Sequence, residues 1–163
     1  MDRLWAPWRM NYIMGEKEPG CIFCDKFKEE RDSENLILHR GQRAYIILNL
    51  YPYNNGHLMV VPYHHVYTTT ELDNDTLLEI LSLTNLCIKL LDQVMHPQGY
   101  NLGFNIGQAG GAGIREHIHL HVVPRWDGDT NFMPVLAETR VMPEMMETTF
   151  KKLKEALNKS RLG

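Results

Sequence analysis

Three histidines occupy alternate positions in the segment EHIHLHVVPR, residues 116–125. Side chains at positions i, i+2 and i+4 of a strand project from the same face, about 6.5–7 Å apart. We therefore expect His117, His119 and His121 to line one face of a strand, and the apolar residues between them to face the core. A neutral imidazole, with an unperturbed pKa of about 6.5, can act as a nucleophile, an acid–base group or a metal ligand.

Three interpretations of this histidine row are compatible with the sequence. In the first, histidines simply fill polar positions of a solvent-facing strand, although three in five residues is an unusual density. In the second, all three bind one catalytic metal ion, although rings spread along one strand do not easily converge. In the third, the rings have separate tasks: one is a nucleophile that forms a transient adduct, and its neighbours contact phosphate or metal.

A glycine-rich segment directly before the histidines favours the third interpretation. GQAGGAG, residues 107–113, contains four glycines in seven residues. Such a loop allows several backbone N–H groups to converge on an anion. Many glycine-rich loops are only turns, but beside a nucleophile these donors suit the negative charge that develops in phosphoryl chemistry.

Cys21 and Cys24 form a C-x-x-C pair, whereas Cys87 stands alone in an apolar stretch. The spacing of the pair suits two ligands of a tetrahedral metal ion, although two simply buried thiols are the alternative. A redox pair would open a helix in a thioredoxin-like βαβ unit, and no such unit follows in the sequence. We interpret Cys87 as a small buried hydrophobic residue.

The elements that must position these residues follow from the spacing of apolar side chains. Strands are predicted in an antiparallel meander at 34–40, 44–50 and 57–62, then at 100–107 and through the histidine row. Amphipathic helices are predicted at 71–95, capped at Asp73, Asn74 or Asp75, and at 143–159. Residues 1–20, with two tryptophans and two prolines, predict an irregular N-terminal arm.

Together these elements predict a single domain of the α+β class over residues 1–163, with helices segregated to one face of an antiparallel sheet. The hydrophobic fraction of 44% and charged fraction of 23% are ordinary for a globular protein. A net charge of −3 without long blocks of one sign does not indicate a nucleic-acid or membrane partner. The polar N-terminus does not suit a secretory signal, so we expect a cytoplasmic location.

The segment HIHLHVV resembles the signature of the histidine triad superfamily of nucleotide hydrolases and transferases. NLYPYNNGHLMVVPYHHV (49–66) is similar to the family's strand–loop–strand, and CIFC (21–24) resembles the cysteine pair of its zinc-containing branch. LWAPWRMNYI (4–13) and HVVPRWDGDTNFMPV (121–135) are most similar to the diadenosine tetraphosphate (Ap4A) phosphorylase-like members. The resemblance spans nearly the whole chain.

This resemblance implies a fold, an assembly and a reaction. The fold would be a sheet of about five antiparallel strands with one long helix and a C-terminal helix, extended across a homodimer through 71–95 and 100–107. The reaction would be nucleotidyl transfer at the α-phosphorus of purine dinucleoside polyphosphates, with Ap4A and inorganic phosphate giving ADP and ATP. Alternatives are a hydrolase of dinucleoside polyphosphates or phosphoramidates and, in another class, a non-catalytic nucleotide-binding or adaptor protein.

The resemblance also implies roles for individual residues. His119 would attack the α-phosphorus and become nucleotidylated. His121 would contact phosphate oxygens and orient His119, and His57 would lie near the same phosphate. Asn49 would contact the ribose, and Asn105 would contact a phosphate or the leaving group.

The glycine-rich loop departs from the family pattern at one position. Gly113 and Ile114 would offer backbone donors, but many family members carry Gln or Ser where this chain has Gly113. A side-chain donor is therefore missing. Either Arg115 or a backbone N–H substitutes for it, or turnover or leaving-group preference differs.

A structural zinc ion is a further implication of the resemblance, with Cys21, Cys24, His65 and His117 as its ligands. His64 lies beside His65, but the family's position matches His65. Two thiolates and two imidazoles would form a closed site without a position for a reacting water. No catalytic metal would be required, although Mg²⁺ can accompany the polyphosphate and neutralise its charge.

Overall fold

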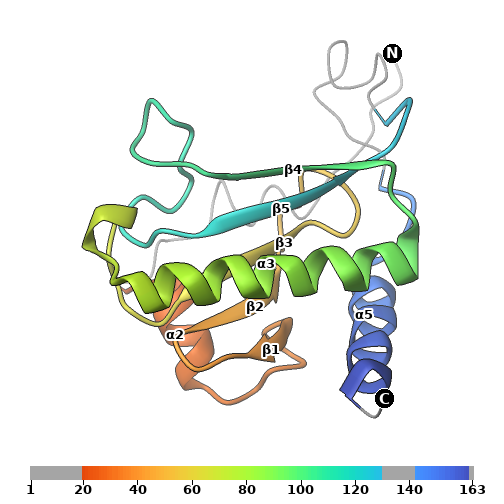
Figure 1. Cartoon of the computed structure of the whole chain (residues 1–163), viewed down its shortest axis with the longest axis horizontal. Helices are drawn as coiled ribbons and strands as arrows, with labels where there is room; N and C mark the ends of the chain where they lie inside the picture. The colour runs from red at the N-terminus through yellow and green to blue at the C-terminus, as the bar shows by residue number, and fades with distance from the viewer. Residues whose placement is uncertain (1–19, 130–141, 162–163) are drawn as a thin grey trace, which may run out of the picture.

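The computed structural model describes residues 20–129 and 142–161. Our expectations for the N-terminal arm before residue 20, and for the segment 130–135, lie outside these residues. The described elements, in chain order and labelled as in Figure 1, are α2 (Ile22–Lys28), β1 (Ile37–Arg40), β2 (Ala44–Leu48), β3 (Leu58–Pro62), the 3-10 turn η1 (Thr69–Glu71), α3 (Asn74–Met95), β4 (Gly99–Phe104), β5 (Leu120–Arg125) and α5 (Met146–Arg161).

The five strands form one antiparallel sheet in the order β1-β2-β3-β5-β4 (Figure 1). The prediction of a five-stranded antiparallel sheet is therefore confirmed. β5, which carries the last histidine of the row, pairs with β3 on one side and β4 on the other. A strand held between two neighbours has little freedom to move, so it suits side chains that need a defined position.

The helices α3 and α5 cover one face of the sheet, and α3 runs in nearly the same direction as β4 in the view of Figure 1. The main core forms here, where alternate strand residues such as Ile46 and Val60 pack with Cys87 of α3 and Leu153 of α5. Asp73 caps α3, because its carboxylate accepts a hydrogen bond from the backbone N–H of Thr76 at 2.7 Å. Among the helices of the described residues, none has the apolar length needed to cross a bilayer.

α2 lies on the opposite face of the sheet and contradicts two expectations. We predicted no helix at these residues, and we expected all helices on one face. Phe23 of α2 packs with Tyr45, Met59 and Val61 in a second buried cluster, and the Tyr45 hydroxyl donates to the carbonyl oxygen of Phe23 at 2.9 Å. A helix of seven residues has too few turns to show an amphipathic period in the sequence.

Two strands begin three or more residues later than predicted, each for a local reason. β1 begins at Ile37, because Leu36 has a left-handed φ of 59° that cannot continue a strand. β5 begins only at Leu120, because the N–H of Ile118 donates to the carbonyl oxygen of Val66 at 2.7 Å and not to a neighbouring strand. The remaining boundaries differ by a few residues: β2 ends at Leu48, β4 spans Gly99–Phe104, and α5 spans Met146–Arg161.

Candidate active site and metal centre

The histidine row lies on the same face of the sheet as α2. His117, His119 and His121 are 0%, 4% and 7% exposed, while Ile118 and the apolar residues that follow at alternate positions pack into the main core on the other face. The predicted alternation is confirmed, although only His121 lies within β5 itself. The interpretation that histidines fill solvent-facing positions is wrong, because all three are buried.

His57, directly before β3, is the first link in a chain of hydrogen bonds. Its Nδ1 accepts a hydrogen bond from the backbone N–H of Tyr53 at 3.0 Å and lies 3.3 Å from the Nδ2 atom of Asn49. Burial, reinforced by the neighbouring imidazoles, lowers the pKa of His57 to about 3, so the ring is neutral. Since Nδ1 accepts, the proton resides on Nε2, which lies 2.9 Å from Nδ1 of His121 and donates to it.

His121 ends this chain with an outward N–H. Burial, with His119 as a second cause, lowers its pKa to about 4, so this ring is also neutral. Because its Nδ1 accepts from His57, the proton of His121 resides on Nε2, 3.4 Å from the side-chain amide of Asn105. The structure thus brings together four of the predicted residues (His57, His121, Asn49 and Asn105), and the final N–H can donate to a phosphate oxygen.

His119 has the opposite tautomer. Its Nδ1 lies 2.9 Å from the carbonyl oxygen of His117, and because a carbonyl can only accept, Nδ1 carries the proton. Burial lowers the pKa of His119, which keeps Nε2 unprotonated at neutral pH. The ring packs against Phe23 at 4.9 Å and against His121 at 4.7 Å between ring centroids. An oriented neutral imidazole with a lone pair on Nε2 is the state in which histidine acts as a nucleophile.

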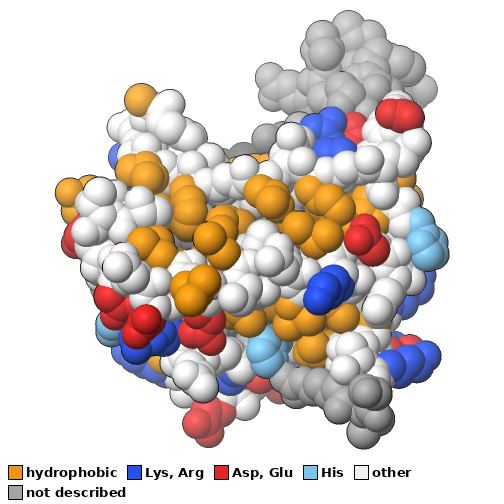
Figure 2. Space-filling model, viewed as in Figure 1, with side chains coloured by type: hydrophobic (Ala, Val, Ile, Leu, Met, Phe, Trp, Pro, Cys, Tyr) orange, Lys and Arg blue, Asp and Glu red, His pale blue; other side chains and the backbone are white. Residues whose placement is uncertain are grey.

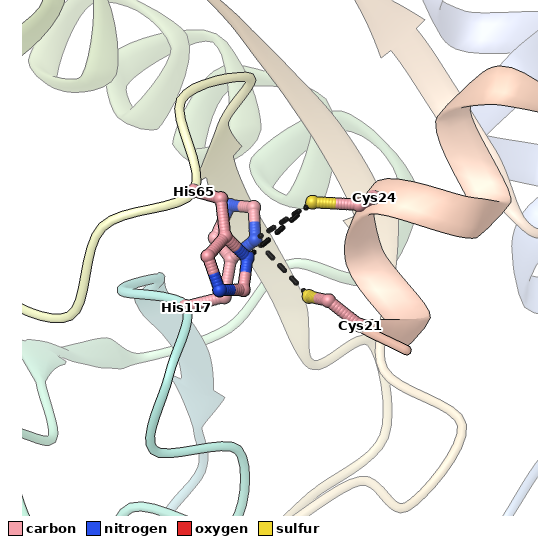
Figure 3. A group of neighbouring side chains, drawn as sticks. All are labelled: Cys21, Cys24, His65 and His117. Atoms are coloured by element: carbon pink, nitrogen blue, oxygen red, sulfur yellow. Dashed lines mark hydrogen bonds between the residues drawn. The ribbon is translucent and has the colours of Figure 1, made fainter. Parts of the chain in front are cut away.

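A second group of side chains brings Cys21, Cys24, His65 and His117 together (Figure 3). Their potential ligand atoms all lie within 4.8 Å of one another. The Sγ atom of Cys21 is 3.2 Å from Nδ1 of His117, and that of Cys24 is 3.4 Å from Nδ1 of His65. Two sulfur and two imidazole donors at these distances fit a tetrahedral zinc ion.

His117 is oriented for this group by a carbonyl. Its Nε2 lies 2.8 Å from the carbonyl oxygen of Pro62 and donates to it, so Nδ1 presents its lone pair to the two cysteines. A carbonyl that accepts from the other ring nitrogen is the usual support of a metal-bound imidazole. His117 therefore faces the thiols whereas His121 faces His57, an arrangement that favours separate tasks over a three-histidine metal tripod.

The glycine-rich loop forms a turn before the row. Gly107 and Gly111 have φ values of 71° and 81°, a conformation that glycine adopts without strain. Gly113 and Arg115 are exposed, and Ile114 is half-buried against the second cluster. The role of Gly113 and Ile114 as backbone donors stays a prediction.

Sequence reasoning missed the position of Tyr53. Its ring lies 4.6 Å from that of His57 and 5.4 Å from that of His121 between centroids, and its hydroxyl is 3.5 Å from Nδ2 of Asn105. The proximity of Tyr53 to His57 in the sequence was a possible signal. The loop pattern YPYNNGH carries no information about the direction of the side chain, however.

The buried His57 makes stability depend on pH. Its pKa is about 3 in the fold and about 6.5 in an unfolded chain, so below pH 6.5 the unfolded chain binds a proton that the fold does not. Stability should therefore fall as pH drops below 6.5, and the loss due to His57 approaches about 1.4 kcal/mol per pH unit once the unfolded chain is fully protonated there. Urea unfolding at pH 7.5, 6.5 and 5.5 should give His57→Gln a shallower pH slope than wild type, by about 1 kcal/mol between pH 6.5 and 5.5.

The matched control for this experiment is His96→Gln, which replaces an exposed histidine after α3. Equal pH slopes in wild type and His57→Gln would contradict a neutral, buried His57.

Comparisons of sequence and of fold with known proteins point to the same family. Residues 30–128 match the HIT domain family. The AP-4-A phosphorylase of Mycobacterium tuberculosis is 38% identical over 158 residues, which cover 91% of this chain and 80% of that protein. An adenosine 5'-monophosphoramidase of Candida albicans is 30% identical over 115 residues, 68% of this chain and 73% of that protein.

Solved structures show the same fold. The crystal structure of a Zn-bound histidine triad family protein from Mycobacterium smegmatis superimposes with a TM-score of 0.71 at 26% identity, covering 88% of this chain and 96% of that one. The family match, the relatives and the arrangement of the buried histidines lead to one conclusion. This chain belongs to the HIT domain family, as an enzyme of the nucleotide hydrolase or transferase type.

Proposed function

We propose that this enzyme cleaves Ap4A at the α-phosphorus through a nucleotidyl-His119 intermediate, with inorganic phosphate as the acceptor. The observation that carries this proposal is the contact of 2.9 Å between Nδ1 of His119 and the carbonyl oxygen of His117, which assigns the free lone pair to Nε2. The relative named AP-4-A phosphorylase, similar over most of the chain, supports the choice of substrate and acceptor.

In the first step, Nε2 of His119 attacks the α-phosphorus. A P–N bond forms, the P–O bond to the β-phosphate breaks, and ATP leaves with the electron pair. The imidazole ring gains positive charge, which the hydrogen bond from Nδ1–H to the carbonyl oxygen of His117 stabilises. The outward N–H of His121 donates to a phosphate oxygen as negative charge develops there.

In the second step, an oxygen of inorganic phosphate attacks the α-phosphorus and the P–N bond breaks. The electron pair returns to Nε2, so His119 becomes neutral again without receiving a proton, and ADP is released. We assign Asn49, beside His57, to the ribose, and Asn105, Gly113 and Ile114 to phosphate oxygens. Mg²⁺ can accompany the polyphosphate and reduce its charge.

The acceptor used in the second step distinguishes the alternative reactions. Water in place of phosphate would make the chain a hydrolase, and the relative named adenosine 5'-monophosphoramidase represents the phosphoramidate alternative. That relative aligns with a smaller part of this chain at lower identity than the phosphorylase does. Similarity to named enzymes also favours catalysis over a non-catalytic nucleotide-binding or adaptor protein.

Product analysis tests the proposed reaction. Wild type should convert Ap4A to ADP and ATP in phosphate buffer, and much more slowly to AMP and ATP without phosphate. His119→Ala should lose at least about 10³-fold in turnover, because the nucleophile is absent. His96→Ala is the control. Equal cleavage of Ap4A without phosphate would contradict the phosphorylase assignment, and an active His119→Ala would contradict the nucleophile.

We propose that Cys21, Cys24, His65 and His117 hold a structural zinc ion. Four protein donors complete a tetrahedral site, so no position remains for a reacting water. When bound, zinc joins α2, the loop after β3 and the segment before β5. The Zn-bound solved relative supports this assignment, and ligands that must stay reduced suit a cytoplasmic location.

Metal analysis tests the zinc assignment. The purified wild type should contain about one zinc ion per chain. Cys21→Ser should lose most of this zinc and unfold at a lower temperature, because metal binding contributes to folding free energy. Cys87→Ala, which alters a cysteine buried in the main core, is the control and should retain zinc. Full zinc occupancy in Cys21→Ser would show that the ion binds elsewhere.

We propose that two copies pair through α3 and β4. Leu78 and Leu81 of α3 are 65% and 57% exposed, and Leu102 of β4 is 49% exposed. Figure 2 shows hydrophobic side chains gathered over these two elements. β4 also ends the sheet, so its outer edge offers backbone groups that can pair with a second β4.

Sedimentation velocity tests this dimer. Wild type should sediment as a dimer, and Leu81→Glu combined with Leu102→Glu should sediment as a monomer, because two charges would be buried in the interface. Met145→Glu, at an exposed position before α5, is the control and should remain dimeric. A monomeric wild type, or a dimeric double variant, would contradict this interface.

A further inference from the structure

We propose that the hydroxyl of Tyr53 binds the acceptor phosphate and thereby favours phosphate over water in the second step. Tyr53 would then determine acceptor specificity without taking part in proton transfer or bond formation. The assignment rests on the proposed phosphorolysis, because it concerns which acceptor reaches the nucleotidyl-His119 intermediate.

The loop between β2 and β3 holds Tyr53 in a defined position. Its backbone N–H donates to Nδ1 of His57 at 3.0 Å, and its ring packs against His57 and His121. The next residue, Asn54, ties the loop to β5 and the turn after it. Its amide donates to the carbonyl oxygen of Pro124 at 3.1 Å and to the carboxylate of Asp129 at 2.8 Å. Tyr53 is 43% exposed, so its ring is supported on one side and accessible to solvent on the other.

The Tyr53 hydroxyl lies beside groups already assigned to phosphate. It is 3.5 Å from Nδ2 of Asn105, and the same Nδ2 is 3.4 Å from Nε2 of His121. Three polar groups from the β2–β3 loop, the segment after β4 and strand β5 therefore converge. Each of the three can donate a hydrogen bond, so together they form a set of donors suited to an anion.

The two chemical steps use the same space for the leaving group and the acceptor. Each step is a displacement in which the entering and leaving atoms are roughly in line with the phosphorus. ATP therefore departs on the side opposite Nε2 of His119, and the acceptor attacks from that side. Donors that hold the departing polyphosphate become available to the incoming phosphate. His121, whose ring contacts both His119 and Tyr53, connects the nucleophile to these donors.

Phosphate and water, as acceptors beside Tyr53, Asn105 and His121, differ in size and charge. Inorganic phosphate carries roughly two negative charges near neutral pH and can use one oxygen for attack while others accept hydrogen bonds. A water molecule has a single oxygen, so it has no further oxygen to accept a hydrogen bond while that oxygen attacks the phosphorus. As inorganic phosphate attacks, a bond forms between one of its oxygens and the α-phosphorus, while the bond between the α-phosphorus and Nε2 of His119 breaks. The Tyr53 hydroxyl keeps its proton, and any proton on the phosphate stays with ADP until it exchanges with solvent.

Tyr53→Phe is the sharpest test, because it retains the ring and the backbone N–H and removes only the hydroxyl. The measurement is the ratio of ADP to AMP formed from Ap4A as phosphate concentration rises. Both products come from one intermediate, so this ratio depends neither on the first step nor on the fraction of folded enzyme. We expect the slope of the ratio against phosphate concentration to fall about tenfold, as for a lost hydrogen bond to a charged group.

Tyr63→Phe is the matched control. It also removes a tyrosine hydroxyl, in this case one that donates to the carbonyl oxygen of Gly41 at 3.2 Å, at the β1–β2 turn. Its slope should equal that of wild type. A Tyr53→Phe slope within about twofold of wild type would overturn the assignment, as would an equal fall in both variants. A wild type that forms only AMP at every phosphate concentration would instead overturn phosphorolysis itself.

Discussion

The burial of neutral imidazoles is the constraint on which this site depends. A buried ring must be uncharged and must find partners for its nitrogens, since an unpaired polar group in the interior is costly. His57 meets this requirement at both nitrogens, and His119 and His121 meet it at Nδ1, through one another and through backbone groups. Each partner dictates which nitrogen carries the proton. The lone pair on His119 and the outward N–H on His121 therefore follow from the packing of the sheet face.

His117 belongs both to the histidine row and to the group that it forms with the two cysteines and His65. Its Nδ1 faces the thiols, its Nε2 donates to Pro62, and its carbonyl oxygen accepts from His119. A change among Cys21, Cys24, His65 and His117 would therefore alter the support of His119, the proposed nucleophile. Phe23 strengthens this connection, because its ring lies 5.5 Å from that of His117 and 4.9 Å from that of His119. The helix that carries Cys24, and that Cys21 directly precedes, thus also packs against the histidine row.

Much of the fold could be predicted because its signals are local. The long helix and the strands show periods of 3.6 and two residues, and α3 begins after Asp73, one of the three expected caps. α2 was missed because contacts that hold it, such as those of Phe23 and of the two cysteines, are made with strands and histidines distant in the sequence. The same helix shows why segregation to one face was wrong: Phe23 packs with Tyr45, Met59 and Val61 on the face of the sheet opposite α3 and α5.

The sequence by itself determined the family and the side of the strand on which the histidines lie, because residue type and spacing carry this information. Spacing also identified Cys21 and Cys24 as a candidate pair of metal ligands, whereas His65 and His117 were expected from the resemblance to the family. Only the tertiary structure decided the tautomers and the position of Tyr53. His57 and His121 are 64 residues apart in the chain, and His119 depends on a backbone carbonyl. A proton has no preferred ring nitrogen until folding brings a donor or an acceptor beside it, and no residue pattern encodes that choice.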